Sequence, residues 1–189
     1  MIIKALTLET TPLYLEAIAQ LRASVWNQQL QTAVFSETKW SDAHDQHAFH
    51  WIVLNEQNNL IASARLCVHQ SVSELPDSQE IEGLLPELPT PIAMMSRLVV
   101  EPSYQRLGIA RRLDIRRLER AGQIGAKSLV LQVPGYRRTS VERLGFEYSG
   151  RAKERTFKET CDIGFYVYFK VLRRLGERIE RSPSCIFRD

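Results

Sequence analysis

The order of strand-like and helix-like segments along this chain predicts an α/β fold: a mixed sheet of about seven strands with four or more helices on its faces. Two observations lead to it. Short apolar runs, one of them alternating with a period of two, are separated by segments whose apolar residues recur at helical spacing. The length of 189 residues suits one domain. We place this domain at residues 1–172, followed by a basic tail at 173–189.

The chain begins with an apolar run, residues 2–8, that predicts a first strand. A threonine before Pro12 predicts the start of a helix, because proline is favoured at the first helical position. Apolar residues at helical spacing continue this helix to about Trp26. The pattern then loosens, and we expect a loop with one or two helical turns near residues 42–49.

A hairpin is expected next, because an asparagine-rich run separates two apolar segments at 50–54 and 60–68. Residues 71–91 hold four prolines and several acidic residues. We expect a mobile surface loop there, with a short helix at 78–85. Residues 92–100 read as the next strand.

Helix and strand alternate in the remaining part of the chain. A helix is expected over 105–122, with glycines as its stop signals. A strand at 127–133 and a short helix at 137–144 follow. Residues 146–152 and 164–171 predict a final antiparallel pair of strands.

The composition excludes several classes of protein. No apolar run reaches the ~20 residues that a membrane-spanning helix requires, and the first residues lack the features of a secretory signal. We therefore expect a cytoplasmic protein with no membrane partner. Cys67, Cys161 and Cys185 are odd in number and widely spaced, so neither a disulfide framework nor a metal site is expected.

Positive charge is concentrated in two arginine-rich segments. These are Arg106, Arg111, Arg112, Arg116, Arg117 and Arg120, and then Arg173, Arg174, Arg178 and Arg181. The preference for arginine over lysine fits bidentate contacts to phosphate or carboxylate. The alternative for each arginine is a solvated helix face, with Asp114 and Glu119 interspersed. The first cluster lacks interleaved aromatic residues, so nucleic acid is not expected as a partner.

The loop before the arginine-rich helix carries the clearest chemical signal. A strand ends near Pro102, a short polar stretch follows, and a helix opens at Gly108. The first turn of a helix has unpaired backbone N–H groups along a favourable dipole, so it can bind an anion. Gly108 and the small Ala110 would let a phosphate approach the backbone, with Arg106 and Arg111 beside it.

This loop resembles the central motif of the GNAT superfamily of N-acetyltransferases, which reads Arg or Gln, two residues, Gly, any residue, then Gly or Ala. Gln105, Gly108 and Ala110 stand at the fixed positions. Residues 142–146, Glu-Arg-Leu-Gly-Phe, resemble the closing motif of that family. The resemblance covers the order of elements over residues 2–171.

The resemblance implies the acyl-CoA N-acyltransferase fold, in which the fourth and fifth strands splay apart to admit acetyl-CoA or another acyl-CoA. It implies that the backbone of Leu98, Val99 and Val100 bonds the pantetheine arm. The residues implied to hold the diphosphate are Gln105, Arg106, Leu107, Gly108, Ile109, Ala110 and Arg111.

The catalytic positions depart from the family pattern. Many members protonate the leaving thiolate with a tyrosine four residues before the glycine of Gly-Phe, and Val141 stands there in this chain. The asparagine common seven residues earlier is Pro134, and the acidic residue of the fourth strand falls near two methionines. As a substitute acid we choose Tyr136, with Ser140 as a further candidate. The alternative for Tyr136 is a loop aromatic packed over the cofactor.

Arg97, on the fourth strand, is the candidate for binding a substrate carboxylate, with a structural ion pair as its alternative. Asp42, Asp45, His47 and His50 form a cluster expected along the substrate face. A histidine suits proton removal near neutral pH, so His50 is a candidate substrate residue. Its alternatives are a structural hydrogen bond, or deprotonation through water with no dedicated base.

The sequence therefore predicts an enzyme that moves an acetyl or other acyl group from CoA to a primary amine of a small molecule. One alternative is a long-chain N-acyltransferase that uses an acyl carrier protein docked on Arg112, Arg116 and Arg120. It would be similar to acyl-homoserine-lactone and N-acyl amino acid synthases, which likewise carry an arginine on that strand. Another is a non-catalytic acyl-CoA sensor. Whether the chain forms a homodimer is left open.

Overall fold

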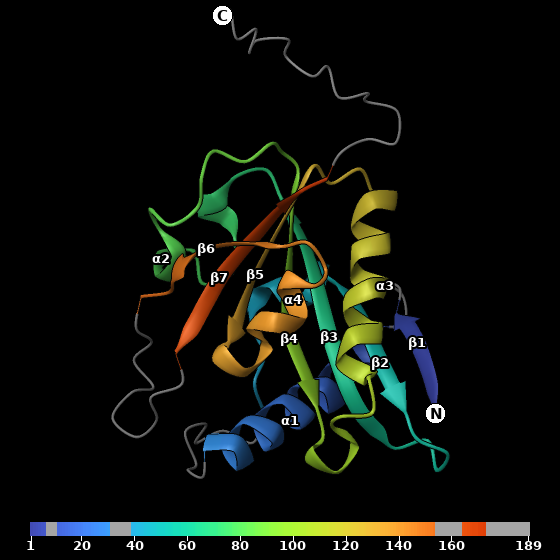
Figure 1. Cartoon of the computed structure of the whole chain (residues 1–189). Coiled ribbons are helices and arrows are strands. Elements are labelled where there is room, and N and C mark those ends of the chain that lie inside the picture. Colours follow the sequence, from blue (N-terminus) through green and yellow to red (C-terminus); the bar gives the residue numbers. More distant parts are fainter. Residues whose placement is uncertain (7–10, 31–38, 154–163, 173–189) are drawn as a thin grey trace, which may run out of the picture.

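A computed structural model of the chain describes residues 1–6, 11–30, 39–153 and 164–172. These residues form a seven-stranded mixed sheet in the order β1-β2-β3-β4-β5-β7-β6 (Figure 1). The strands are β1 (Ile2–Leu6), β2 (Phe49–Leu54), β3 (Leu60–His69), β4 (Ile92–Val100), β5 (Ser128–Pro134), β6 (Glu147–Arg151) and β7 (Phe165–Val171). The predicted α/β mixed sheet is confirmed. The basic tail, Cys161 and Cys185 lie outside the described residues.

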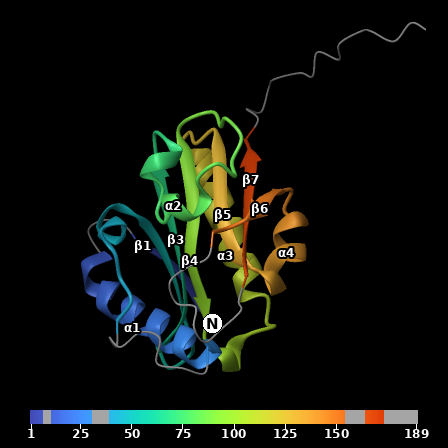
Figure 2. The ribbon, with the colours of Figure 1, turned by 90° about the vertical axis from the view of Figure 1, so that its left-hand side faces the viewer.

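Helices cover both faces of this sheet. They are α1 (Thr11–Leu30), α2 (Ser78–Ile81), α3 (Ile109–Gln123) and α4 (Arg138–Glu142), with 3-10 turns η1 (Ala43–His47), η2 (Val72–Glu74), η3 (Pro102–Tyr104) and η4 (Gly135–Arg137). Figure 2 shows α1 and α2 on one face and α4 on the other, where α3 also packs. None of the helices in the described ranges combines the length and apolarity needed to cross a membrane.

Strand β4 lies at the centre of the sheet and contributes side chains to a hydrophobic core on each of its faces. It pairs antiparallel with β3 and parallel with β5, and α3 makes the crossover between β4 and β5. Its side chains alternate between faces, so Ala93 and Met95 join the core beneath α3. Ile92 and Met94 join the core beneath α2. Burial on both faces explains why β4 reads as a continuous apolar run.

Two predicted helix boundaries are wrong. The first helix runs to Leu30 rather than Trp26, because the residues that follow Trp26 include good helix formers and neither glycine nor proline. The helix expected from residue 105 begins at Ile109 instead. Arg106 and Gly108 have φ values of 62° and 77°, which a right-handed helix does not allow.

The segment between β3 and β4 was expected to be a mobile surface loop, and its packing corrects that expectation. Leu75, Ile81 and Leu88 are buried and form a core with Met94 and Val130. Because these apolar side chains cover one face of β4 and β5, the segment is part of the core layer. The predicted helix is shortened to the single turn of α2, because Glu82 has a ψ of 127° and Gly83 a φ of 77°, which a right-handed helix does not allow.

Candidate functional site

A cleft opens where β4 and β5 separate. The two strands pair only from Ile92 with Ser128 to Met95 with Leu131. Beyond that pair both strands continue, with no further pairing between them. A cleft of about 1040 Å³ occupies the opening, lined by both strands and their flanking helices. The predicted splay of the fourth and fifth strands is therefore present.

The cleft is lined from both faces of the sheet. Val25, Trp26 and Gln29 line it from α1, on one face. Residues of α3 and α4, among them Asp114 and Ser140, line it from the other. Two molecules can therefore approach from opposite faces and meet between the strands.

An irregularity in β4 falls at the edge of this cleft. The register with β3 shifts between Ser63 and Arg65, opposite the stretch of β4 from Ser96 to Val99. Within that stretch Arg97 has a φ of 53°, in the left-handed region. A bulge of this kind breaks the alternation of side chains and re-aims one of them. Arg97 lines the cleft as a result.

The turn between β4 and α3 forms one end of the cleft. The Gln105 side chain donates a hydrogen bond from Nε2 to the Val100 carbonyl over 3.1 Å, which ties the turn to β4. Gly108 is the N-cap of α3 in left-handed conformation, and no side chain of the described residues caps the helix. A Cβ added at Gly108 would meet no atom within 4 Å. The amides of the first turn thus remain available to a ligand.

The structure brings nearly all of the predicted cofactor residues to this cleft. Leu107 is the exception: it is 60% exposed and does not line the cleft. The other predicted cofactor residues all line the cleft: Leu98, Val99, Val100, Gln105, Arg106, Gly108, Ile109, Ala110 and Arg111.

The described lining of the cleft has a large excess of positive charge. Its acidic residues are Asp77 and Asp114. Its basic residues are Arg97, Arg106, Arg111, Arg117, Arg137 and Arg143. An excess of guanidinium groups in a concave site attracts anions and favours a ligand with several phosphates.

Sequence reasoning missed a buried ion-pair network in the wall of the cleft. Asp114 was expected on a solvated helix face, yet its carboxylate is buried and receives hydrogen bonds from both Arg117 and Arg137. Arg117 also donates to the Ser96 carbonyl of β4 over 3.2 Å, and burial lowers its pKa to about 10. A signal existed, because residue 117 follows Leu113 by four and so shares its buried face.

A second network lies on the α1 face. Asp45 accepts hydrogen bonds from Arg22 at 2.9 Å and Arg65 at 3.0 Å. Asp42 accepts from Arg65 at 2.6 Å and from Arg97 at 2.7 Å. Burial would raise the pKa of each carboxyl, but the arginines outweigh it and hold both pKa values below the usual range. Arg97 therefore makes an ion pair with Asp42, as the structural alternative for this side chain expected.

His50 does not reach the cleft, which corrects its assignment to the substrate. It is fully buried, and its Nε2 lies 2.9 Å from the Asp45 carbonyl. Burial lowers the pKa of His50, so the ring is neutral at pH 7. The alternative given for His50, a structural hydrogen bond, describes this residue correctly. His47 is exposed and also lies away from the cleft lining.

The two candidate acids follow β5 in the chain, Tyr136 in η4 and Ser140 in α4. Tyr136 lines the cleft, is 69% exposed, and its Oη lies 3.5 Å from Oε1 of Gln29 on α1. Ser140 also lines the cleft, but its hydroxyl donates to the Arg137 carbonyl over 2.6 Å. The proton of Ser140 is thus already engaged, whereas Tyr136 faces the open cleft. Val141, at the position of the family's tyrosine, is buried.

Aromatic side chains gather at the α1 end of the cleft. The Trp26 ring lies 6.1 Å from Trp40 and 5.8 Å from Phe165, between centroids. The Arg97 guanidinium stacks over Trp40 at 4.1 Å. All four residues line the cleft. An apolar surface beside a cation suits a ligand that has both an apolar part and an anionic group.

Comparison with known proteins identifies related sequences and folds. Residues 15–146 match the family model described as "Acetyltransferase (GNAT) family". No curated protein matches the sequence. An acyl-CoA N-acyltransferase from Pseudomonas aeruginosa superposes with a TM-score of 0.62 at 16% identity, covering 90% of this chain and 100% of that one.

Two further structures extend the comparison. A ribosomal-protein-alanine N-acetyltransferase from Brucella melitensis gives a TM-score of 0.55 at 15% identity, covering 91% of this chain and 100% of that one. The CoA-dependent acyl-homoserine lactone synthase BjaI, solved with SAM and isopentyl-CoA, gives 0.67 at 15% identity, covering 91% and 83%. At these identities the likeness establishes a shared fold.

Proposed function

The chain belongs to the acetyltransferase (GNAT) family, and from that premise we propose that it moves an acetyl or other acyl group from coenzyme A to the primary amine of a small molecule. The observation that carries the proposal is the separation of β4 from β5 beyond Met95 and Leu131. This opening joins the two faces of the sheet, so an acyl donor and an amine can meet there.

The donor groups of the cleft fit coenzyme A. The uncapped amides after Gly108 would hold its diphosphate, with Arg106 and Arg111 beside them. Residues 98–100 would hold the pantetheine arm along the unpaired side of β4. When bound, the cofactor supplies the acyl group as a reactive thioester.

The acceptor would enter from the α1 face. Asp42 and Asp77 engage Nε and Nη2 of Arg97, and Nη1 makes no hydrogen bond to the described residues, so it can bind a carboxylate of the acceptor. Trp26 and Trp40 would pack against its apolar part. Histidine and glutamate are absent from the described lining, so we propose that the amine loses its proton through water.

Tyr136 is our choice for the group that protonates the departing thiolate. Its hydroxyl lies at the cleft, and its contact with Gln29 is long at 3.5 Å. A tyrosine phenol ordinarily titrates near pH 10, so Tyr136 holds its proton at neutral pH and can donate it.

A second candidate function uses a longer acyl group on an acyl carrier protein. Arg111, Arg112 and Arg116 are exposed on α3 beside the cleft and offer a basic surface to an acidic carrier. Arg120 fits this role less well, because it stacks over Phe49 at 4.6 Å. A CoA-dependent acyl-homoserine lactone synthase of similar fold was solved with isopentyl-CoA, so this fold can accommodate an acyl group longer than acetyl.

One experiment in two steps tests these proposals. Acetyl-CoA should raise the unfolding temperature, whereas acetate or adenine should not, because a ligand that binds only the folded state stabilises it. Thiol release is then measured with a panel of amines, using acetyl-CoA, octanoyl-CoA, palmitoyl-CoA and octanoyl carrier protein. No stabilisation by any acyl-CoA would refute the cofactor site. Stabilisation without release for any amine or donor would favour the sensor.

A further inference from the structure

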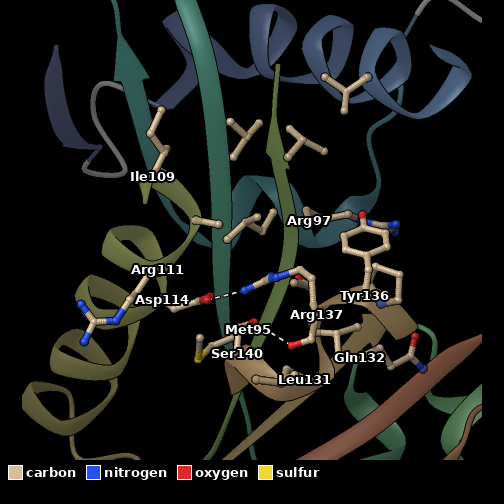
Figure 3. Close-up of a pocket in the computed structure, with 18 of the residues that line it drawn as sticks. Met95, Arg97, Ile109, Arg111, Asp114, Leu131, Gln132, Tyr136, Arg137 and Ser140 are labelled. Atoms are coloured by element: carbon tan, nitrogen blue, oxygen red, sulfur yellow. Dashed lines mark hydrogen bonds and ion pairs between the residues drawn. The ribbon is translucent and has the colours of Figure 1, made fainter. Parts of the chain in front are cut away.

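Arg137 reaches across the cleft close to the point where β4 and β5 separate. Its side chain extends from the turn after β5 to Asp114 on α3, and it is 14% exposed (Figure 3). Ser140 fixes the start of this span by donating to the Arg137 carbonyl. This hydrogen bond holds the backbone of Arg137 in place, and the guanidinium projects from it into the cleft.

The far end of the span is anchored to β4. Asp114 is held by Arg117, which donates to the carbonyl of Ser96 over 3.2 Å. Ser96 directly follows Met95, the last residue of β4 paired with β5. These contacts link the Arg137 guanidinium, through Asp114 and Arg117, to the part of β4 where the strands separate. Asp114 lies five residues after Ile109, the first residue of α3.

The charge of Arg137 is not cancelled by its partner. A single carboxylate, Asp114, is shared between the guanidiniums of Arg117 and Arg137. The group thus has one positive charge in excess, at the wall of a cleft already rich in arginine. Such a charge, fixed before the reaction begins, stabilises negative charge that develops beside it.

We propose that Arg137 is a catalytic residue that stabilises the sulfur of coenzyme A as a thiolate when it leaves. This inference rests on the proposed acyl transfer. In that step the amine nitrogen bonds to the thioester carbon, the carbon–sulfur bond breaks, and its electron pair stays on sulfur. The thiolate then takes a proton from Tyr136 or water, and the amine loses one to water. Arg137 thereby offsets the loss of the family's tyrosine at Val141.

The test measures the pKa of the coenzyme A thiol bound to the protein, which requires neither an acceptor nor turnover. Thiolate absorbance is followed against pH, with the desulfo-CoA complex as the blank for protein thiols. Burial raises the pKa of Cys67 to about 11, so it contributes little in the range of interest. Variants are Arg137→Met, Arg137→Lys and, as control, Arg138→Met. Arg138 lies outside the cleft lining and stacks on Tyr166.

The bound thiol should titrate at least about one pH unit lower in the wild type than in Arg137→Met, a tenfold change in its ionisation constant. Arg137→Lys should recover part of the shift, and Arg138→Met should match the wild type. Equal pKa values in wild type and Arg137→Met would overturn the inference, as would loss of all CoA binding in Arg137→Met. If wild-type protein fails to bind CoA, the proposed function itself is wrong.

The unaltered protein gives an independent check should a variant not fold. If the bound thiolate is favoured, the Kd of CoA should fall relative to that of desulfo-CoA as pH rises toward the ordinary thiol pKa of about 8.5. If the Kd of CoA divided by the Kd of desulfo-CoA stays constant or rises with pH, the role of Arg137 is contradicted.

Discussion

Met95 of β4 and Leu131 of β5 are the last two residues that pair across the centre of the sheet. Side chains of Met95 and Leu131 both belong to the core beneath α3, so the paired region is firmly packed up to this point. Beyond it the strands diverge around a cleft that reaches both faces. The site is thus an interruption of the sheet at the only parallel pair among the described strands, rather than a hollow on its surface.

Replacement of Arg97 should weaken acceptor binding. We expect Arg97→Gln to raise KM for a carboxylate-bearing acceptor by roughly 10–100-fold, since charged hydrogen bonds contribute about 1.5–3 kcal/mol. The KM for acyl-CoA should change little. Steady-state kinetics with both substrates measures the two effects separately. An acceptor KM equal to that of the wild type would show that Arg97 serves only its ion pair with Asp42.

Tyr136→Phe should slow the transfer and leave CoA affinity intact. Loss of a general acid typically costs 10²-fold or more in kcat, so a decrease of about that size is expected. The decrease should shrink for donors whose thiol is a better leaving group, because they need less protonation. An unchanged kcat across donors would assign the phenol a packing role only.

The buried pair of Asp45 and Arg22 should matter more to stability than an exposed pair. Asp45→Asn leaves two buried guanidiniums without their shared carboxylate and should cost about 3–5 kcal/mol of unfolding free energy. Glu119→Gln removes an exposed partner of Arg116 and should cost under about 1 kcal/mol. Urea unfolding of the two variants compares these costs directly. Similar values would refute the importance of the buried network.

Stability should fall as pH drops below neutrality because of His50. Burial lowers the pKa of His50 in the folded protein, so the unfolded chain binds the proton more readily. The stabilisation is therefore complete above the ordinary pKa of 6.5 and is lost as pH falls through the lower folded value. The slope contributed can reach about 1.4 kcal/mol per pH unit. In His50→Gln, urea unfolding between neutral pH and pH 5 should show a flatter profile.

The order of elements could be predicted because each has a local signal. Alternation along β7 and the asparagine turn before β3 both lie within a few residues, so their patterns are visible in the sequence. The helical pattern placed the start of α3 at residue 105, because the left-handed backbone of Arg106 has no residue signature. The loop motif placed it at Gly108, next to the observed start at Ile109. Packing of Leu75 and Ile81 depends on contacts with β4 and β5, which local periodicity does not contain.

The site likewise has one part with a local sequence signal and another that depends on long-range contacts. The turn that would hold the diphosphate is one continuous segment, so a motif could identify it. The ion pairs of Asp114 with Arg137 and of Asp45 with Arg22 join residues 23 positions apart. Such pairing is fixed by the topology of the sheet, and spacing along the chain gives no indication of it. His50 was misassigned for this reason, since its burial follows from the register of β2.

The placement of the diphosphate is tested most directly by CoA affinity in two matched glycine variants. Gly108 and Gly125 have φ values of 77° and 76°, and a Cβ at either would meet no protein atom within 4 Å. Alanine should therefore destabilise both variants by about 1–2 kcal/mol. We predict that Gly108→Ala raises the Kd for CoA at least about tenfold, since a lost contact of about 1.4 kcal/mol suffices, while Gly125→Ala binds as the wild type does. Equal affinity in both variants would contradict a phosphate at the amides of α3.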